Sequence, residues 1–328
     1  MASAAKLWWG RLTSLTARRV YRVGRIAAIG STIFGAGYSS GIKAALEDPE
    51  GTKRKVLMSM LQQQGGGEAG ILDAEDPHSR FITRLGMQLI HAAESHIAQA
   101  IADLKESDGA ARRKEELEAK LRALHDLPWK FVVINSSSIN AFVTDVLPGY
   151  VFVHRGLLEA FDNDEDQLAF ILGHELGHYL LEHGQKARDI GTALSILQLA
   201  VLGSVDPTGV VSAAIEFGAF TYGVNLAAVL PQSRQHEHEA DELGLQLVAR
   251  TCRDPQRAAT AHRRLMELER AGGGDTSRTS IFSSHPATEE RFANLQAQVP
   301  EARKLYDACG CSARKHVILR TLGLASGS

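Results

Sequence analysis

The chain has few cysteines and little net charge. Its 328 residues include only three cysteines, and an odd number argues against a framework of structural disulfides. Cys309 and Cys311 flank a single glycine and could respond to redox conditions, although two ordinary thiols are the commoner outcome for such a pair. The formal net charge of −2 is low, which argues against nucleic acid as a partner.

A long uninterrupted hydrophobic segment is also missing from the sequence. Residues 26–42 are uncharged, but these 17 residues include four glycines. A membrane-spanning helix needs about 20 mostly apolar residues, so this segment is a marginal span. A second apolar stretch, residues 190–230, is interrupted by Asp206 and Glu216. The interruptions favour helices that pack over a cleft or dip into one leaflet, and a membrane hairpin is the alternative.

Acidic residues are missing from the first 46 positions, where the chain carries seven Lys and Arg residues. A basic, acid-free segment with several Ser and Thr residues is typical of mitochondrial or plastid targeting peptides, and a basic surface arm is the alternative. We therefore expect a targeting or membrane-anchor segment over residues 1–46. Residues 47–78 contain the run Gln62–Gly67 and predict a linker.

Apolar periodicity predicts mainly helices after this linker. Residues three and four positions apart predict a long amphipathic helix from about Phe81 to Leu104, and a shorter charged helix follows from Ala110 to Leu124. Residues 131–134 predict the start of a strand. The expected fold class is α+β, mainly α, with one small sheet, and residues 79–128 would form a helical spacer.

Five residues in the next predicted helix have the spacing of a metal site. Residues 174–178 read His-Glu-Leu-Gly-His, and apolar residues at helical spacing predict a helix over about 166–186. On a helix, His174 and His178 lie on one face roughly 6 Å apart, close enough to bind one metal ion, while Glu175 points toward the flank. A core helix with incidental histidines is the alternative, so the motif needs a third ligand.

A second motif offers that ligand. Residues 233–241 and the apolar run 243–248 predict a helix that carries Glu237 and Asp241 one turn apart. Gluzincins use this pairing, in which Glu237 would be the third ligand of one Zn²⁺ ion per chain. Asp241 would accept the outer N–H of a ligand histidine and so fix its tautomer.

Other polar residues near the two motifs are rival ligands. A metzincin site would need a glycine at the position of Leu181, so this spacing is excluded. His183 is expected to be a polar residue near the helix end rather than a fourth ligand. Three candidates close to Glu237 point to other helix faces and are expected to be solvated: His236, His238 and Glu239.

Together these motifs resemble those of the HtpX and CAAX-prenyl-protease family of membrane-associated zinc endopeptidases. The resemblance runs from about Phe131 to Leu295 and includes the pair His285-Pro286 and Arg291. It implies a zincin-like metalloprotease domain built around the HExxH helix. Within the family, the layout is most similar to that of mitochondrial inner-membrane members, and bacterial periplasmic relatives share the compact domain.

The resemblance also implies roles for individual residues. Glu175 would be the general base, and His285 would donate a hydrogen bond to the developing oxyanion, with a helix-start histidine as the alternative. Arg291 either pairs with an acidic group near the site or is a solvated helix residue. Asn140 and Ala141, followed by residues 148–153, resemble the family's edge strand and turn, where the Asn-Ala pair contacts the substrate backbone.

The sequence therefore predicts a zinc-dependent endopeptidase of an organelle membrane. Its catalytic domain would cover residues 129–300, with a helical tail over 301–328. Expected partners are protein and peptide substrates, chiefly membrane-associated or misfolded proteins, and a homo-oligomer is one option. The mitochondrial inner membrane is the expected location, with a plastid membrane as the alternative. The competing function is a chaperone or holdase with a structural zinc ion, which has no need of a base such as Glu175.

Overall fold

The computed structural model describes residues 70–105, 109–143, 147–184, 230–271 and 285–314, together with the single residues 58, 186 and 281. The expected targeting segment, most of the expected linker and most of the second apolar stretch lie outside the described residues. Among the described helices, none combines the length and the apolar character that a bilayer crossing requires.

Three short strands form one sheet in the order β1-β3-β2. β1 (Lys130–Ile134) runs parallel to β3 (Tyr150–His154), and β2 (Ala141–Val143) pairs antiparallel with β3 at the edge. The strand predicted at residues 131–134 is confirmed. The expected edge strand is limited to β2, because the chain turns at Gly149, whose φ of 82° suits glycine, and the residues after it form the central strand.

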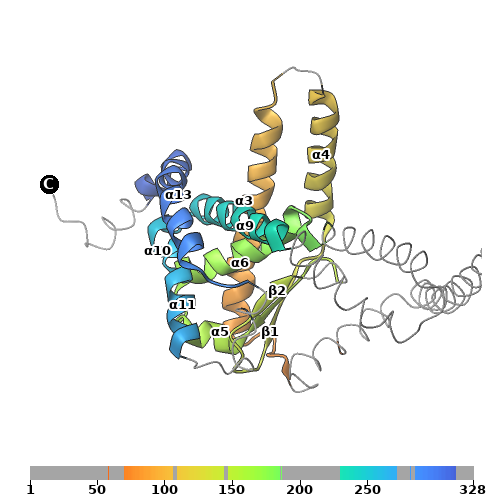
Figure 1. Ribbon diagram of the computed structural model, residues 1–328. Coiled ribbons are helices and arrows are strands. Elements are labelled where there is room, and N and C mark those ends of the chain that lie inside the picture. Colours follow the sequence, from red (N-terminus) through yellow and green to blue (C-terminus); the bar gives the residue numbers. More distant parts are fainter. Residues whose placement is uncertain are drawn as a thin grey trace, which may run out of the picture. The chain divides into compact units, whose positions relative to one another are not determined.

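Two long helices precede the sheet and lie side by side (Figure 1). α3 (Pro77–Ala102) begins after Asp76, whose side chain accepts a hydrogen bond from a backbone N–H of the first turn, and α4 (Ala110–Asp126) follows. Both helices were predicted from apolar periodicity and are confirmed. The apolar face of α3 packs against β1 and against the next long helix, α6 (Glu165–Leu180).

The helix α6 carries the HELGH motif and follows the short helix α5 (Arg155–Ala160). Asp164 caps α6 by accepting hydrogen bonds from two backbone N–H groups of the first turn. The helix ends at Leu180, earlier than the predicted end near residue 186, because Glu182 adopts a left-handed conformation with a φ of 58°. The chain therefore turns just before His183.

Helices also make up the second half of the described chain. The second motif lies on α9 (Leu230–Arg250), so the helix predicted there is confirmed. The helices that follow are α10 (Pro255–Ala259), α11 (Ala261–Ala271) and α13 (Glu289–Ala308).

A disulfide joins Cys252, just after α9, to Cys311, just after α13. The argument against a framework of several disulfides leaves room for this single bond, but the expectation that Cys309 and Cys311 are two ordinary thiols is wrong for Cys311. An odd count requires only that one thiol stays free, and Cys309 is that thiol. The bond joins the C-terminal ends of α9 and α13, and its two cysteines are 59 positions apart in the sequence.

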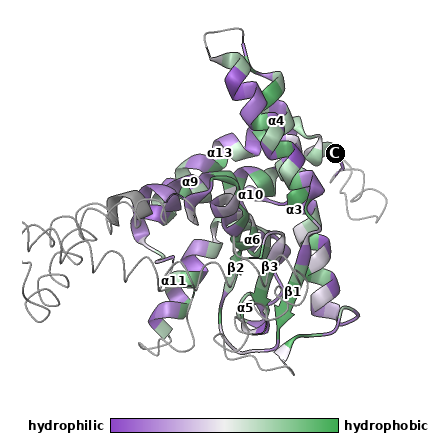
Figure 2. Cartoon of the chain, turned by 90° about the vertical axis from the view of Figure 1, so that its right-hand side faces the viewer, coloured by the Kyte–Doolittle hydropathy of each residue, from purple (hydrophilic) through white to green (hydrophobic). Residues whose placement is uncertain are grey.

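Hydrophobic residues gather in the strands and on the helix faces that are turned toward them (Figure 2). The core includes Leu85 of α3, Leu168 of α6 and Leu295 of α13, each at most 1% exposed. The first and last of the described long helices therefore share one core with the helix that carries the HELGH motif. The domain boundaries expected at residues 128 and 300 stay predictions.

Glycines line the contact between α6 and α9 and allow the two helices to lie close together. A Cβ atom at Gly244 would be 2.8 Å from the backbone nitrogen of His174, and one at Gly173 would be 3.0 Å from the carbonyl oxygen of Gly244. At Gly177, a Cβ atom would be 3.1 Å from the carbonyl oxygen of Ala240. The absence of these side chains lets the two motifs face each other across a short distance.

Candidate metal centre

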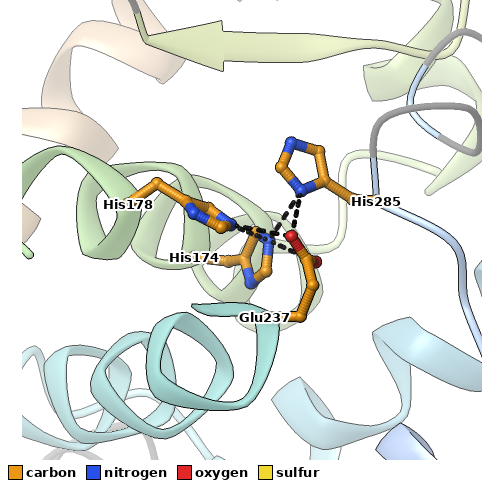
Figure 3. A group of neighbouring side chains, drawn as sticks. All are labelled: His174, His178, Glu237 and His285. Carbon is orange, nitrogen blue, oxygen red and sulfur yellow. Dashed lines mark hydrogen bonds and ion pairs between the residues drawn. The ribbon is translucent and has the colours of Figure 1, made fainter. Parts of the chain in front are cut away.

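Four potential ligand side chains converge between α6, α9 and the segment before α13 (Figure 3). His174 and His178 come from α6, Glu237 comes from α9, and His285 precedes Thr288, the N-cap of α13. One ligand atom from each of the four side chains lies within 4.8 Å of the others. The structure thus brings the three predicted ligands together and adds His285 to them.

The distances between the ligand atoms suit a small cation. The Nε2 atoms of His174 and His178 are 3.0 Å apart, and carboxylate oxygens of Glu237 lie 3.5 Å and 3.3 Å from them, respectively. Tetrahedral zinc ligands at their usual bond lengths are about 3.3 Å apart. Two imidazole nitrogens that direct lone pairs at each other repel unless a cation or proton lies between them. The donor set therefore fits zinc.

His285 lies among these ligand atoms. Its Nδ1 is 2.9 Å from Oε1 of Glu237 and 3.5 Å from Nε2 of His174. The alternative of a helix-start histidine is wrong, because α13 begins only at Glu289. In this position His285 is a fourth potential ligand, and its role as an oxyanion donor stays a prediction.

Glu175 lies beside the ligand group and its side chain is only 5% exposed. Its Oε1 has no hydrogen-bond partner among the described residues, and an ion-pair contact to Nε2 of His285 measures 3.7 Å. Burial raises the pKa of Glu175 above its ordinary value. A buried carboxylate with an unused oxygen and a raised pKa is suited to accept a proton from water.

The outer nitrogen of His174 faces a buried ion pair. Oδ1 of Asp241, the residue expected to support a ligand histidine, lies 2.9 Å from Nδ1 of His174. Arg291 of α13 donates hydrogen bonds of 2.9 Å and 2.8 Å to the two oxygens of Asp241, and its Nη1 is 2.7 Å from Oε2 of Glu237. Of the two readings of Arg291, the structure therefore supports pairing with acidic groups at the site.

Burial and the contacts among these side chains set the charges of the site. Burial raises the pKa of Glu237 and of Asp241, but hydrogen bonds from neighbouring histidines outweigh it and hold both pKa values well below the ordinary range, with Arg291 adding to the effect on Asp241. Burial lowers the pKa of His174 to about 4. At neutral pH both carboxylates are ionised and His174 is neutral, which are the states that bind a metal ion.

The outer nitrogen of His178 has partners that the sequence did not indicate. Nδ1 of His183 is 2.9 Å from Nδ1 of His178, and Nε2 of His183 is 3.1 Å from Oε2 of Glu239. The ring of His236 stacks on that of His183, with ring centroids 4.1 Å apart. The expectation that Glu239 and His236 are merely solvated is therefore wrong, and His183 is buried against His178.

A helical pattern could not have predicted this contact. On a straight helix, residues five positions apart point about 140° away from each other, so His183 would not face His178. The two side chains meet only because α6 stops at Leu180 and Glu182 turns the chain. No spacing rule marks such a left-handed residue when it is not a glycine.

The two expected substrate-binding residues lie at the start of the edge strand. Asn140 is buried and its carbonyl oxygen accepts a 2.9 Å hydrogen bond from the backbone N–H of His154, while Ala141 is the buried first residue of β2. β2 packs against α6, the helix that carries the HELGH motif. Among the described residues, β2 pairs with β3 alone, so its other edge is the side on which a further strand would add.

Residues 107–299 match peptidase family M48. The sequence is 33% identical to "Metalloendopeptidase OMA1, mitochondrial" of Bos taurus over 200 residues, which cover 60% of this chain and 37% of that protein. It is 33% identical to "Mitochondrial metalloendopeptidase OMA1" of Schizosaccharomyces pombe over 190 residues, which cover 57% of this chain and 52% of that protein.

A bacterial protein is similar at a lower level. The "Beta-barrel assembly-enhancing protease" of Escherichia coli is 28% identical over 183 residues, which cover 54% of this chain and 36% of that protein. The chain thus spans about half or less of the length of these relatives. The stretch that matches the family, residues 107–299, contains the ligand residues of α6 and α9, as well as His285 and Arg291.

Proposed function

This chain belongs to peptidase family M48, and we propose that it is a zinc-dependent endopeptidase that hydrolyses peptide bonds in membrane-associated or misfolded proteins. The observation that carries the proposal is the convergence of His174, His178 and Glu237 on one point, with the buried Glu175 beside them. The names of the relatives, metalloendopeptidase and protease, support it.

Three side chains would hold the zinc ion, His174 and His178 through Nε2 and Glu237 through its carboxylate. When bound, zinc supplies a Lewis acid for the peptide carbonyl and makes water a better nucleophile near neutral pH. Asp241 keeps the proton of His174 on Nδ1, so that Nε2 directs its lone pair at the ligand group. Arg291 holds the carboxylates of Asp241 and Glu237 in place.

Glu175 would be the general base. It would take a proton from the attacking water and deliver it to the leaving amine as the peptide bond breaks. Its position beside the ligand group and its buried Oε1, which has no hydrogen-bond partner among the described residues, support this role. A holdase with a structural zinc ion is not favoured, because such a protein gains nothing from a carboxylate that is buried at this place with an oxygen that accepts no hydrogen bond.

His285 would donate a hydrogen bond to the oxyanion that develops on the substrate, and its place among the ligand atoms gives it a second potential role. The variant His285→Ala separates the two. A lower kcat with unchanged zinc affinity supports the oxyanion donor. Weaker zinc binding supports a ligand and contradicts the donor role.

The substrate backbone would add to the open edge of β2, next to Asn140 and Ala141. The position of β2 against α6 supports this, because a strand added there would pass the HELGH helix. We place the protein in mitochondria, at the inner membrane, on the strength of the mitochondrial names of two relatives. Imaging of the tagged full chain beside an inner-membrane marker tests this location.

The function is tested with the full chain and the variant Glu175→Gln. The wild-type protein should bind about one zinc ion per chain and cleave an unfolded protein substrate, and a chelator should abolish cleavage until zinc is restored. Glu175→Gln should keep the metal and lose kcat by about 10²- to 10⁴-fold, because only the base is removed. Glu269→Gln, an exposed position on α11, is the matched control. Full activity of Glu175→Gln, or no zinc in the folded wild-type protein, contradicts the proposal.

A further inference from the structure

A zinc-ligating histidine needs a partner for its outer nitrogen, because that partner fixes the tautomer and the orientation of the ring. His174 has Asp241 in this role. For His178 the outer nitrogen is Nδ1, since Nε2 is the atom turned toward His174 and Glu237. The group at this outer nitrogen is the imidazole of His183, at 2.9 Å.

One arrangement of protons satisfies these contacts. If Nε2 of His178 keeps its lone pair for the ligand group, its Nδ1 carries the proton and donates a hydrogen bond to Nδ1 of His183. His183 then carries its own proton on Nε2, which lies 3.1 Å from Oε2 of Glu239. The donors therefore run from His178 to His183 to Glu239, and the series ends on an ionised acceptor, which makes the stronger kind of hydrogen bond.

Several contacts hold His183 in this position. Its side chain is only 4% exposed, and the ring of His236 stacks on it at an interplanar angle of 12°. Gln235 donates a 2.7 Å hydrogen bond to Oε1 of Glu239, and the other carboxylate oxygen, Oε2, accepts from His183. The left-handed residue Glu182 comes directly before His183, whose side chain reaches His178 of α6.

His183 does not share the metal ion as a further ligand. Its Nδ1 meets the outer nitrogen of His178, while the ligand atom of His178 is the nitrogen on the other side of the ring. The described ligand group includes His285 but not His183. The contact with His178 therefore acts on the ligand and not on the ion.

We propose that His183, held by Glu239, is a positioning residue that fixes the tautomer and the orientation of His178 and thereby strengthens zinc binding. The proposal rests on the proposed zinc site but not on peptide hydrolysis. It assigns roles to two residues outside the ligand set, and one of them, His183, lies beyond the end of the metal-binding helix.

The test measures zinc affinity by competition with a chelator, using the full chain and four variants. His183→Phe removes both nitrogens but keeps a ring that can stack on His236, and zinc should bind about 10- to 100-fold more weakly. His183→Asn keeps an acceptor near the position of Nδ1 and should recover most of the affinity. Glu239→Gln keeps the shape but loses the charge, so a loss of several-fold is expected. Glu242→Gln, an exposed carboxylate on the same helix whose partner is Gln246, should bind zinc as the wild type does.

Cobalt gives a second measurement that a purely structural role would not change. In the Co²⁺-substituted protein, the visible absorption bands report the ligand geometry. They should shift in His183→Phe and stay unchanged in Glu242→Gln. Circular dichroism in the presence of chelator establishes that each variant is folded, and Glu239→Gln provides the measurement if His183→Phe does not fold.

Equal zinc affinity and equal cobalt spectra in the wild-type protein and in the folded His183 and Glu239 variants would overturn the proposal alone. Failure of the folded wild-type protein to bind zinc would overturn both the metal site and this proposal. Weaker binding and shifted bands in His183→Phe, with recovery in His183→Asn, support it. The two kinds of failure are therefore distinguishable.

Discussion

The two metal-facing histidines of α6 are one helical turn apart, but their outer nitrogens lie in different surroundings. His174 faces Asp241 and, behind it, Arg291, whose side chains are 4% and 7% exposed. His178 faces His183, and behind it Glu239 is 38% exposed. One histidine is thus supported by a buried ion pair and the other by an imidazole that leads to a carboxylate near solvent.

This difference predicts how the groups behind His174 and behind His178 should respond to mutation. Removing one member of a buried ion pair leaves a charge without a partner in a medium of low dielectric, which destabilises the fold strongly. Removing a charge that solvent already screens destabilises it little. Substitution of the buried Asp241 or Arg291 should therefore chiefly affect folding. Substitution of Glu239, which is nearer solvent, should chiefly affect metal binding.

The largest effect is expected from Arg291→Met. The substitution leaves Asp241 and Glu237 buried without their cation, so the free energy of unfolding should fall by about 3–5 kcal/mol. Urea denaturation of the metal-free protein measures the change. Arg270→Met is the matched control, because Arg270 pairs with Glu289 where both side chains are about 70% exposed, and it should lower the free energy by less than about 1 kcal/mol. Similar losses in the two variants would show that the buried ion pair of Arg291 contributes no more to stability than an exposed one.

Removal of the disulfide should have the next largest effect, because it ties together the helices that carry Asp241 and Arg291. The bond joins residues 59 positions apart, and its loss in Cys252→Ala/Cys311→Ala should lower the free energy of unfolding by about 2–4 kcal/mol. The control is Cys309→Ala, which removes the free thiol and should change little. Urea denaturation with and without reductant measures both. If reductant does not destabilise the wild-type protein, the disulfide does not stabilise the packing of the helices that carry Asp241 and Arg291.

A histidine outside the ligand group separates acid effects on the fold from acid effects on the site. Burial lowers the pKa of His154 to about 4, so below pH 6.5 the unfolded chain binds a proton that the folded chain excludes. Stability from this residue is complete above pH 6.5 and is lost as the pH falls toward 4, by up to about 3 kcal/mol. His154→Asn should flatten this part of the pH dependence of unfolding. An unchanged slope would show that His154 does not contribute to the acid sensitivity of the fold.

The parts of the site that could be predicted from the sequence are those set by the period of a helix. His174, His178 and Glu237 follow from residues four apart on α6 and from the motif on α9, and the strand and helices before α6 follow from apolar spacing. These patterns are local, so one sequence suffices to find them.

The parts that could not be predicted depend on where a helix stops or on contacts between distant segments. His183 reaches His178 only because Glu182 is left-handed, and Arg291 reaches Asp241 across 50 positions. The partner of Cys252 is likewise set by the packing of α9 beside α13. Tertiary packing decides each of these contacts, and no local pattern encodes it.

The smallest effect is expected from a double-mutant cycle across the two sides. Asp241→Asn acts on the support of His174, and Glu239→Gln acts on that of His178. Although both residues lie on α9, their contacts at the site differ, since one contacts His174 and Arg291 and the other contacts His183. In the metal-free protein, their effects on the free energy of unfolding should therefore add to within about 0.5 kcal/mol.

The same cycle measured on zinc affinity should show coupling, because His174 and His178 bind the same ion and a change in one ligand alters how well the other binds. Urea denaturation in chelator gives the first cycle, and chelator competition gives the second. A coupling well above 0.5 kcal/mol without metal would mean that the two supports form one network through α9. The difference in burial between Asp241 and Glu239 would then not predict separate effects of their substitutions.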